Sequence, residues 1–542
     1  TSASSVEPRP LVDTEFPGYD PLQLVSSTRR SFMKLMGASL ALAGVSLTGC
    51  RRWPKEEVVP YASNPKDRVP GIPERYATVM ELGGVGIGLL VSCYDGRPIK
   101  IEGNPDHPFA LTSPGLGAAD AFAQASLLEM YDPERSRSPV DRSKGKDAHS
   151  TWDAFSDAVA GYFPADGAGG GGGAILSEAA SGPSALEMKK LFLKKFPQAK
   201  WHEYEPISSD NEWMGAKLAF GKPLRALANL QKASVIVSLD ADLLGLHPAH
   251  LRYAADWASG RRSGDQGRMN RMYVAESCFS ITGAMADERL PSRPSRLNAI
   301  AAALAAKLGV EGATSAPLSA EEAQFVQRAA ADLNLKSNAG KGVIAAGAHL
   351  PAELHALTYA MNAKIGALGE TLEMLDLPEL DRPDPPDPDI PGSPAEAIAA
   401  LTEEMKGGRV NTLLILGGNP VYDAPADLDF GKALAGIANS IHLSVYQNET
   451  SRTCKWHLPR AHYLEAWGDA RAFDGTVSIA QPMIEPLFGG KSVIELLALV
   501  AGETVNTGSA IVRRSAETML GGADKDMAFR RALHDGVVSG TA

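Results

Sequence analysis

The amino-acid sequence predicts an α/β protein with two doubly wound parallel sheets, an N-terminal β-hairpin domain and an extended N-terminal arm. Short apolar runs such as AILS (174–177) and VNTLLILGGNP (410–420) alternate with amphipathic helical segments, a pattern typical of parallel sheets. Two apolar arms flank Asp95-Gly96 in LLVSCYDGRPIKIEG, which indicates a hairpin with a two-residue turn. Five prolines within residues 51–75 exclude long helices and central strands there.

The order of these patterns predicts how the chain is divided. We expect an extended arm at 1–28, an export segment at 29–50, a proline-rich and β-hairpin domain at 51–140, a first α/β domain at 141–335, a second at 336–500, and a C-terminal segment at 501–542. The last segment has no obvious closing element, so we expect the chain to be a fragment or one half of a split polypeptide.

Composition restricts the classes of function. The chain has 542 residues and a net charge of −11, and this acidic balance disfavours general nucleic-acid binding. The cysteines Cys50, Cys93, Cys278 and Cys454 lie far apart and form no C-x-x-C pair. A metal or iron–sulfur site built from local sequence is therefore excluded. Free cysteine behaves as a small apolar residue, and we expect Cys93, Cys278 and Cys454 to be packed.

Residues 28–50, TRRSFMKLMGASLALAGVSLTGC, have the pattern of a twin-arginine export signal. Arg29 and Arg30 precede an apolar stretch too short for a spanning helix, and LTGC resembles a lipobox in which Cys50 is the candidate for lipidation. We expect export by the twin-arginine route to the periplasmic face of the membrane. Two outcomes remain open: a processed lipoprotein that starts at Cys50, or a retained helix buried against partners.

Polar residues follow two of the predicted strands. Asp240 and Asp242 end the strand in SVIVSLDADLLG (234–245), where a nucleotide-binding fold would contact a ribose; a structural turn is the alternative. Gly417, Gly418 and Asn419 follow the strand at 410–420. The glycines permit close approach of a phosphate to the backbone, but the longer G-x-G-x-x-G pattern is absent, which favours a tight turn.

The densest group of metal-ligand residue types is His457, His462, Glu465 and Asp469. A metal site is conceivable, but Pro459 interrupts the helix that would align these residues, and we expect a hydrogen-bonded or interface role. Nucleophile, base and acid residues do not form a recognisable catalytic set.

Several motifs occur in a fixed order that resembles the large subunit of the molybdopterin oxidoreductase superfamily. They are DGRPIKIEGNPDHP (95–108), YDPERSRSP (131–139), VSLDADLLG (237–245), LLILGGNPVYDAP (413–425) and the segment 448–487. The resemblance covers residues 75 to 540. It implies that the loops at 240–242 and 417–419 stand where this family grips its pterin dinucleotide. Ser208 and Ser209 are then the nearest, weak candidates for a molybdenum ligand.

Three further motifs resemble the B subunits of alternative complex III: ITGAMADERLPSRP (281–294), WHLPRAHYLEAWGDARAFDG (456–475) and ALHDGVV (532–538). The resemblance implies a subunit of a membrane complex that oxidises quinol and passes electrons to a periplasmic acceptor. In this family the molybdopterin-like part is a scaffold, and a ferredoxin-like part holds iron–sulfur clusters.

The sequence departs from the active enzymes of the superfamily. Those enzymes hold a [4Fe–4S] cluster through cysteines on both sides of the opening hairpin, whereas residues 76–91 and 110–120 contain none. We therefore expect no cofactor in this chain, with Asp240, Asp242, Gly417, Gly418 and Asn419 as vestigial positions. Iron–sulfur clusters and c-type haems are expected on partner chains or in a missing C-terminal part.

Two functions follow. The first is a cofactor-free scaffold of a quinol-oxidising complex, which organises iron–sulfur and haem partners. The alternative is a catalytic molybdopterin-dependent oxidoreductase subunit of polysulfide or formate type, which the intact DGR and GNP loops favour.

Overall fold

The computed structural model describes residues 33–34, 69, 71–109, 111–113, 116–163, 170–262, 269–376, 393–522 and 524–542. The chain divides into two units, Thr1–Val69 and Pro70–Ala542. The predicted arm, Arg29, Arg30 and Cys50 lie outside the described residues. All of the fold described below belongs to the second unit. Within the described ranges, no helix is long and apolar enough to cross a membrane.

An antiparallel sheet opens the second unit. Its strand order is β1-β2-β3-β5-β4, with β1 at Glu74–Leu82, β2 at Val85–Tyr94, β3 at Arg97–Gly103, β4 at Leu111–Ser113 and β5 at Leu116–Gly117. Asp95 and Gly96 join β2 to β3 with φ angles of 48° and 79°. Positive φ at both central residues is the requirement of the tight hairpin turn that Asp-Gly pairs favour. The predicted hairpin is confirmed.

Cys93 lies on β2 and is 1% exposed. It packs in an apolar cluster with Val91, Ile101 and Met130, as expected for a packed thiol. Cys454 is also buried, and burial raises the pKa of its thiol to about 12. The expectation for Cys278 is wrong: this side chain is exposed, because β12 ends before it.

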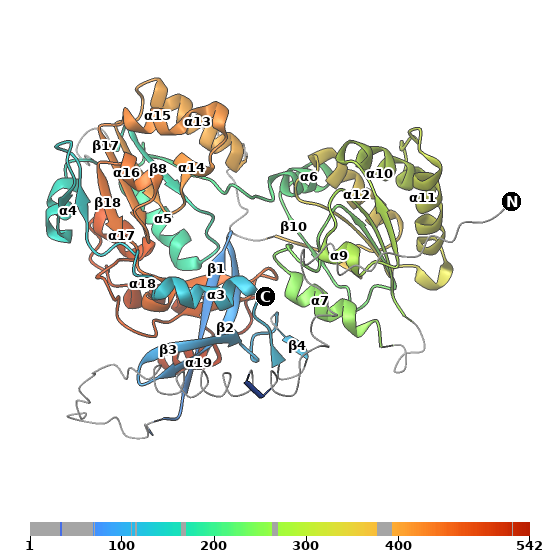
Figure 1. Ribbon diagram of the computed structural model, residues 1–542, viewed down its shortest axis with the longest axis horizontal. Coiled ribbons are helices and arrows are strands. Elements are labelled where there is room, and N and C mark those ends of the chain that lie inside the picture. The colour runs from blue at the N-terminus through green and yellow to red at the C-terminus, as the bar shows by residue number, and fades with distance from the viewer. Residues whose placement is uncertain are drawn as a thin grey trace. The chain divides into compact units, whose positions relative to one another are not determined.

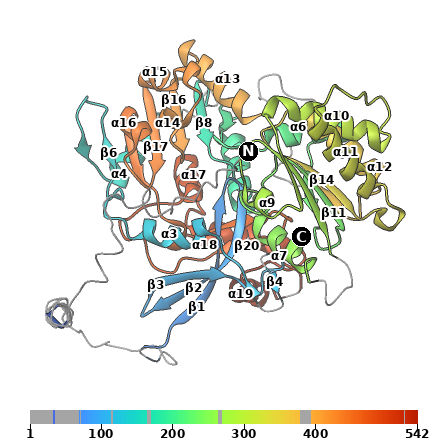
Figure 2. The ribbon, with the colours of Figure 1, turned by 45° about the vertical axis from the view of Figure 1, so that its right-hand side comes forward.

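The larger parallel sheet has seven strands in the order β7-β6-β18-β17-β16-β8-β9. Their bounds are Ala148–His149, Val140–Asp141, Trp456–Pro459, Asn439–Ser444, Thr412–Leu416, Gly173–Ser177 and Lys200–Glu203. The five strands from β18 to β9 are parallel, and β6 and β7 form an antiparallel edge. Figure 2 shows β8, β16 and β17 side by side.

Helices bury both faces of this sheet, which explains the uninterrupted apolar run of β16. Leu414 and Leu416 pack in one cluster with residues of α4 (Trp152–Val159), α5 (Pro183–Lys195) and α17 (Val493–Ala501). Leu413 and Ile415 pack in another with residues of α13 (Pro394–Lys406) and α15 (Phe430–Ala435). Alternate side chains of a strand point to opposite faces.

The second parallel sheet has four strands in the order β13-β12-β11-β14. Their bounds are Glu288–Pro291, Arg271–Glu276, Val235–Leu239 and Gly342–Ala346. Around it lie α6 (Asp210–Phe220), α7 (His250–Ser259), α9 (Ile281–Ala284), α10 (Pro294–Leu308), α11 (Ala320–Leu333) and α12 (Ala352–Lys364). Figure 1 shows the two sheets as separate α/β layers. Two doubly wound parallel sheets are therefore present, as predicted.

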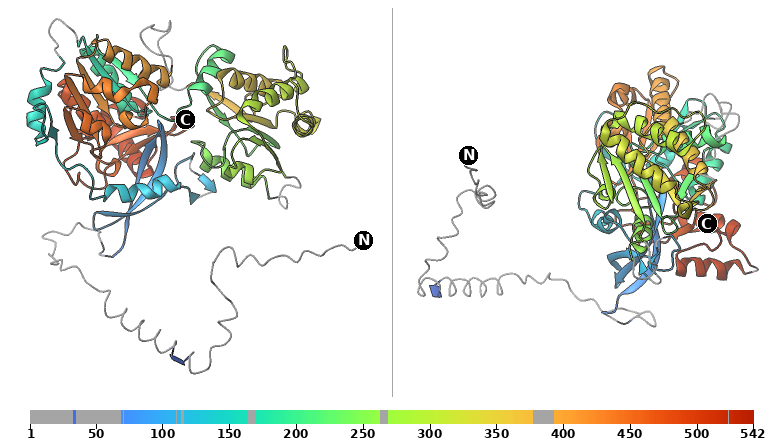
Figure 3. Two further views of the ribbon diagram at one scale, coloured as in Figure 1. Left: turned by 45° about the horizontal axis from the view of Figure 1, so that its top comes forward. Right: turned by 90° about the vertical axis from the view of Figure 1, so that its right-hand side faces the viewer.

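The remaining elements are short or lie near the C-terminus. They are β10 (Arg225–Ala228), β15 (Leu372–Leu375), β19 (Gly468–Arg471), β20 (Val477–Ala480), α3 (Ala121–Met130), α14 (Pro420–Asp423), α16 (Glu449–Thr453), α18 (Gly508–Met519), α19 (Lys525–Asp535), and the 3-10 turns at Lys336–Asn338, Ala426–Leu428 and Tyr463–Glu465. The helix α19, red in Figure 3, contacts β1, and the Asn104 side-chain amide donates to the carbonyl of Asp535 at 2.8 Å.

The sheets do not follow the boundary that we predicted between residues 335 and 336. The strand β14 lies beyond that boundary, yet it pairs with β11 of the four-stranded sheet. The strand β8 lies before it, yet it pairs with β16 of the seven-stranded sheet. Parallel strands are joined by crossovers, so apolar periodicity identifies a strand without identifying its neighbour.

Two motifs that are distant in sequence meet in a buried ion pair. Arg135, from YDPERSRSP, donates two hydrogen bonds to the carboxylate of Glu465, at 2.9 and 2.6 Å. The side chains are 2% and 0% exposed. Burial opposes ionisation of Glu465, but hydrogen bonds from Arg135 and from the His462 and Leu487 amides outweigh it, so its pKa is lowered. The pair joins the chain near residue 135 to the loop that follows β18.

We expect Glu465→Gln to lower the free energy of unfolding by about 3–5 kcal/mol, because it leaves the Arg135 guanidinium buried without a counter-charge. Urea-induced unfolding followed by tryptophan fluorescence measures the effect. Glu517→Gln is the matched control: Glu517 pairs with Arg513 on the surface, where the side chains are 41% and 46% exposed, and its loss should change stability by less than about 1 kcal/mol. Equal destabilisation by both variants would contradict the expected role of the buried pair.

Candidate functional site

A cavity of about 570 Å³ lies at the carboxyl ends of the seven-stranded sheet. Its wall includes Glu178 after β8, Gly417 and Gly418 after β16, Val445 after β17 and Arg460 after β18. Residues of β1 and β19 also line it. In open α/β sheets this edge is where ligands bind, so the cavity is the candidate functional site.

Gly417 and Gly418 form a loop that holds a carboxylate. Both have positive φ angles, 94° and 67°, which favour glycine. The Gly418 amide donates to Oε1 of Glu178 at 3.0 Å. A Cβ atom built on Gly417 would lie 2.1 Å from Oε2 of Glu178, so this close approach requires glycine.

Arg460 completes the contacts of that carboxylate. Its Nη1 donates to Oε2 of Glu178 at 2.5 Å, and the Coulombic attraction of Glu178 raises the pKa of the guanidinium. One carboxylate oxygen therefore faces a backbone amide and the other faces a cation. Backbone amides and guanidinium groups make similar charge-assisted hydrogen bonds with other anions.

Asn419 is not among the residues that line the cavity. Its Nδ2 donates to Glu449 at 2.7 Å, and its Oδ1 accepts from the Thr450 amide at 3.2 Å and the Thr450 hydroxyl at 2.9 Å. Asn419 thus ties the loop to α16.

Two buried histidines support the loop from behind. His442 contacts the Gly417 carbonyl through Nε2 at 3.3 Å and the Ser451 hydroxyl through Nδ1 at 2.8 Å. His457 contacts the same hydroxyl at 3.0 Å and the Ser136 hydroxyl at 2.5 Å. Burial lowers the pKa of His442 to about 4 and that of His457 to about 3, so both rings are neutral at pH 7.

The hydroxyl of Ser451 lies at the centre of this group. It donates to the Tyr446 carbonyl at 3.1 Å and lies within hydrogen-bond distance of Nδ1 of both histidines. In a trans peptide the carbonyl and the following N–H point in opposite directions. The contact of His442 with the Gly417 carbonyl therefore lies on the opposite side of this peptide from the Gly418 N–H, which faces Glu178.

The four residues of the H-x4-H-x2-E-x3-D pattern do not form one cluster. His457 contacts serines, Glu465 pairs with Arg135, and Asp469 accepts from the Ser184 amide at 3.0 Å and its hydroxyl at 2.5 Å. Nε2 of His462 lies 3.7 Å from a carboxylate oxygen of Glu129. Among the residues that the structure describes, no group of three or more metal-ligand side chains could hold a metal ion.

Negative charge dominates the cavity. Six carboxylates line it, namely Glu81, Glu129, Glu178, Glu203, Glu205 and Asp469, against the side chains of Lys189, Arg460 and His462. Burial raises the pKa of Glu81 and of Glu205 to about 7, and that of Asp469 to about 6. A further anion entering the cavity would meet this excess of acidic groups.

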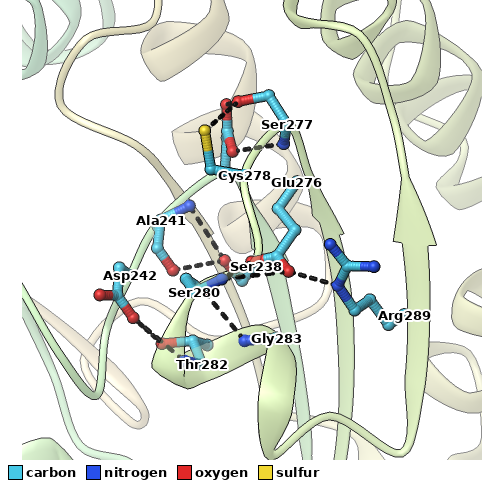
Figure 4. A network of polar contacts seen from close by, with 11 residues as sticks. Ser238, Ala241, Asp242, Glu276, Ser277, Cys278, Ser280, Thr282, Gly283 and Arg289 are labelled. Carbon is cyan, nitrogen blue, oxygen red and sulfur yellow. Dashed lines mark hydrogen bonds and ion pairs between the residues drawn. The ribbon is translucent and has the colours of Figure 1, made fainter. Parts of the chain in front are cut away.

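Asp240 and Asp242 lie at the carboxyl edge of the other sheet and do not line the cavity. Asp240, at φ 55°, accepts from the Ser277 amide at 2.8 Å, the Ser277 hydroxyl at 2.9 Å and His349 at 3.1 Å. Asp242 accepts from the amide of Thr282 at 3.1 Å and its hydroxyl at 2.7 Å. These hydrogen bonds match the structural-turn alternative, and Figure 4 shows the Asp242–Thr282 contact.

Several polar residues at the carboxyl edges of the two parallel sheets were not predicted from the sequence. Glu178 and Arg460 directly follow the strands β8 and β18. Their position immediately after a buried strand could have identified them. In the other sheet, Glu276 ends β12 and accepts from Arg289 and Ser280, both at 2.5 Å (Figure 4). Ser208 and Ser209, the weak molybdenum-ligand candidates, stand just before α6 and do not line the cavity.

Comparison with known proteins defines the class of fold. The structure superposes on acetylene hydratase from Pelobacter acetylenicus with a TM-score of 0.61 and 13% identity, covering 80% of this chain and 71% of that chain. The chain therefore has the α/β fold of the molybdopterin oxidoreductases.

A curated protein of similar sequence is the menaquinone reductase, molybdopterin-binding-like subunit, of Nitratidesulfovibrio vulgaris (strain Hildenborough). The two are 22% identical over 512 residues, which cover 88% of this chain and 72% of that protein. No family model matches the chain.

The cavity does not fit the cofactor that gives this fold its name. A pterin dinucleotide carries an anionic pyrophosphate, which needs backbone amides and cations. Here the amide of Gly418 and the guanidinium of Arg460 already hold Glu178. The other carboxylates of the cavity add repulsion.

The titration of Glu81 is testable by Glu81→Gln. Oε1 of Glu81 accepts from the amide and the hydroxyl of Ser181, both at 2.7 Å, and Gln keeps an acceptor oxygen. The pKa rises from 4.5 to about 7 on folding, so protonated Glu81 contributes stability that is full below pH 4.5 and lost as the pH rises through 7. Wild type should lose about 1–2 kcal/mol of unfolding free energy through this group between pH 5 and pH 8. The variant has no carboxyl group at this position, so its unfolding free energy minus that of wild type should rise by the same amount.

Urea-induced unfolding of both proteins at the two pH values measures this difference. Glu517→Gln, on the surface, is the control for a change that lies outside the cavity. A difference between Glu81→Gln and wild type that stays constant with pH would contradict the prediction.

Proposed function

We propose that this chain is a cofactor-free, molybdopterin-oxidoreductase-like scaffold subunit of a membrane-bound quinol-oxidising electron-transfer complex of the alternative complex III type. Similarity to a menaquinone reductase subunit supports its place in a quinone-linked complex. The observation that carries the cofactor-free role is the carboxylate of Glu178, held in the Gly417-Gly418 loop by Gly418 and Arg460.

In this proposal the redox groups belong to other chains or to a further part of the polypeptide. The partners are an iron–sulfur ferredoxin-like domain, c-type cytochrome subunits and the membrane subunits that oxidise quinol. The chain brings them into electron-transfer register at the periplasmic face of the membrane, with association through partners or through a lipid on Cys50. The sequence pattern around Arg29 and Arg30 supports export by the twin-arginine route.

The catalytic alternative loses one of the two features that favoured it. The GNP loop is intact, but its central residue Asn104 is 1% exposed and uses its polar atoms within the fold. Its backbone amide donates to Gly88 at 3.0 Å, its side-chain amide donates to Asp535 at 2.8 Å, and its Oδ1 accepts from the Asp106 amide at 2.9 Å. Packing is therefore a sufficient reason for this loop, and the scaffold proposal is preferred.

Affinity purification of the tagged full-length chain from detergent-solubilised membranes tests the proposal. We expect quinol-oxidising activity, iron and c-type haem to copurify, with molybdenum and tungsten far below one atom per chain. Elemental analysis and haem spectra provide the measurement. One molybdenum or tungsten atom per chain would exclude the cofactor-free role, and recovery of the chain without redox partners would exclude the scaffold role.

The proposed export route has its own test. We expect replacement of Arg29 and Arg30 together by lysine to leave the protein in the cytoplasm, because the twin-arginine machinery recognises the arginine pair. Cell fractionation and immunoblotting measure the distribution, with Lys34→Arg as a control variant in the same segment. Normal periplasmic accumulation of the double variant would exclude this route.

A further inference from the structure

We infer that Glu178 is an internal anion that closes a phosphate-binding position at the Gly417-Gly418 loop, and that its removal opens this position to pyrophosphate. The inference deepens the proposed cofactor-free function and rests on it. In this inference, the side chain of Glu178 keeps other anionic groups away from the carboxyl edge of the sheet.

The first argument is the geometry of the loop. Gly417 and Gly418 both adopt left-handed backbone angles, and the Gly418 amide donates to Glu178 at 3.0 Å. A Cβ atom on Gly417 would lie 2.1 Å from Glu178 and 2.5 Å from Nη1 of Arg460. Glycine at position 417 thus leaves room for a negatively charged oxygen beside the loop. The Cβ atom of any other residue at this position would fill that space.

The second argument is the fixed orientation of the amide donor. His442 contacts the Gly417 carbonyl at 3.3 Å on the far side of the same peptide group. Burial lowers the pKa of His442 to about 4, and Nδ1 of its ring lies 2.8 Å from the Ser451 hydroxyl. The peptide whose N–H faces Glu178 is therefore contacted on its other side by a buried ring.

The third argument is the paired cation. Arg460 follows β18 and donates to Glu178 at 2.5 Å, and both side chains are partly exposed, at 33% and 38%. A carboxylate and a phosphate oxygen make similar charge-assisted hydrogen bonds with a guanidinium. Glu178 reaches this position from the neighbouring strand β8, whose pairing with β16 places Ser177 opposite Leu416.

The other charged groups around the Gly417-Gly418 loop determine how tightly an anion should bind there. Glu81, Glu203, Glu205 and Asp469 line the same cavity and oppose an incoming anion. Removal of Glu178 therefore should create a weak site, with its affinity dependent on salt.

Binding of inorganic pyrophosphate to the full-length chain tests the inference by isothermal titration calorimetry and by the shift of the thermal unfolding midpoint. We expect Glu178→Ala to bind pyrophosphate at least tenfold more tightly than wild type, and Glu178→Ala with Arg460→Ala to lose that gain. Glu178→Gln keeps the shape of the side chain and removes its charge, so its gain in pyrophosphate affinity should be smaller. This variant replaces Glu178→Ala in the test if the alanine variant does not fold.

Glu203→Ala is the matched control, because it removes a carboxylate from the same cavity outside the Gly417-Gly418 loop. A gain in Glu203→Ala equal to that in Glu178→Ala would overturn the inference, since lower negative charge alone would then explain binding. Equal pyrophosphate binding by wild type and both Glu178 variants would also overturn it. Molybdenum in the wild-type chain would instead exclude the proposed function, so the two failures are distinguishable.

Discussion

The contact of Glu178 with the Gly418 amide and the Arg460 guanidinium is the interaction on which the carboxyl edge of the larger sheet depends. Parallel strands end with unpaired amides and polar loops at one edge, and an open edge of this kind attracts an anion. Here a side chain supplies the anion. In the proposed cofactor-free role, the protein itself thereby supplies the anion that this edge attracts.

Two other buried polar arrangements hold that edge together. The Arg135–Glu465 pair connects the chain after α3 to the loop after β18, from which Arg460 also extends. The neutral pair His442 and His457 shares the Ser451 hydroxyl and supports the Gly417 carbonyl. Arg135 and Glu465 are 330 residues apart, so this pair forms only when distant parts of the chain have come together. His442, Ser451 and His457 instead belong to one continuous stretch that contains β17, α16 and β18.

Much of the fold could be predicted because its strands and turns have strong local signals. The hairpin at Asp95-Gly96 follows from the turn that this pair favours, and β16 follows from an apolar run buried on both faces. Strand partners could not be predicted, and the boundary at residue 335 failed for that reason.

The sequence by itself determined the α/β class, the hairpin turn and the glycines of the 417–418 loop, since each depends on residue types that are adjacent in the chain. Only the tertiary structure decided what that loop binds. Glu178 and Arg460 stand 282 residues apart and meet because β8, β16, β17 and β18 are neighbours in one sheet. The same assembly separated His457, Glu465 and Asp469, which are close in sequence, and gave each a different partner.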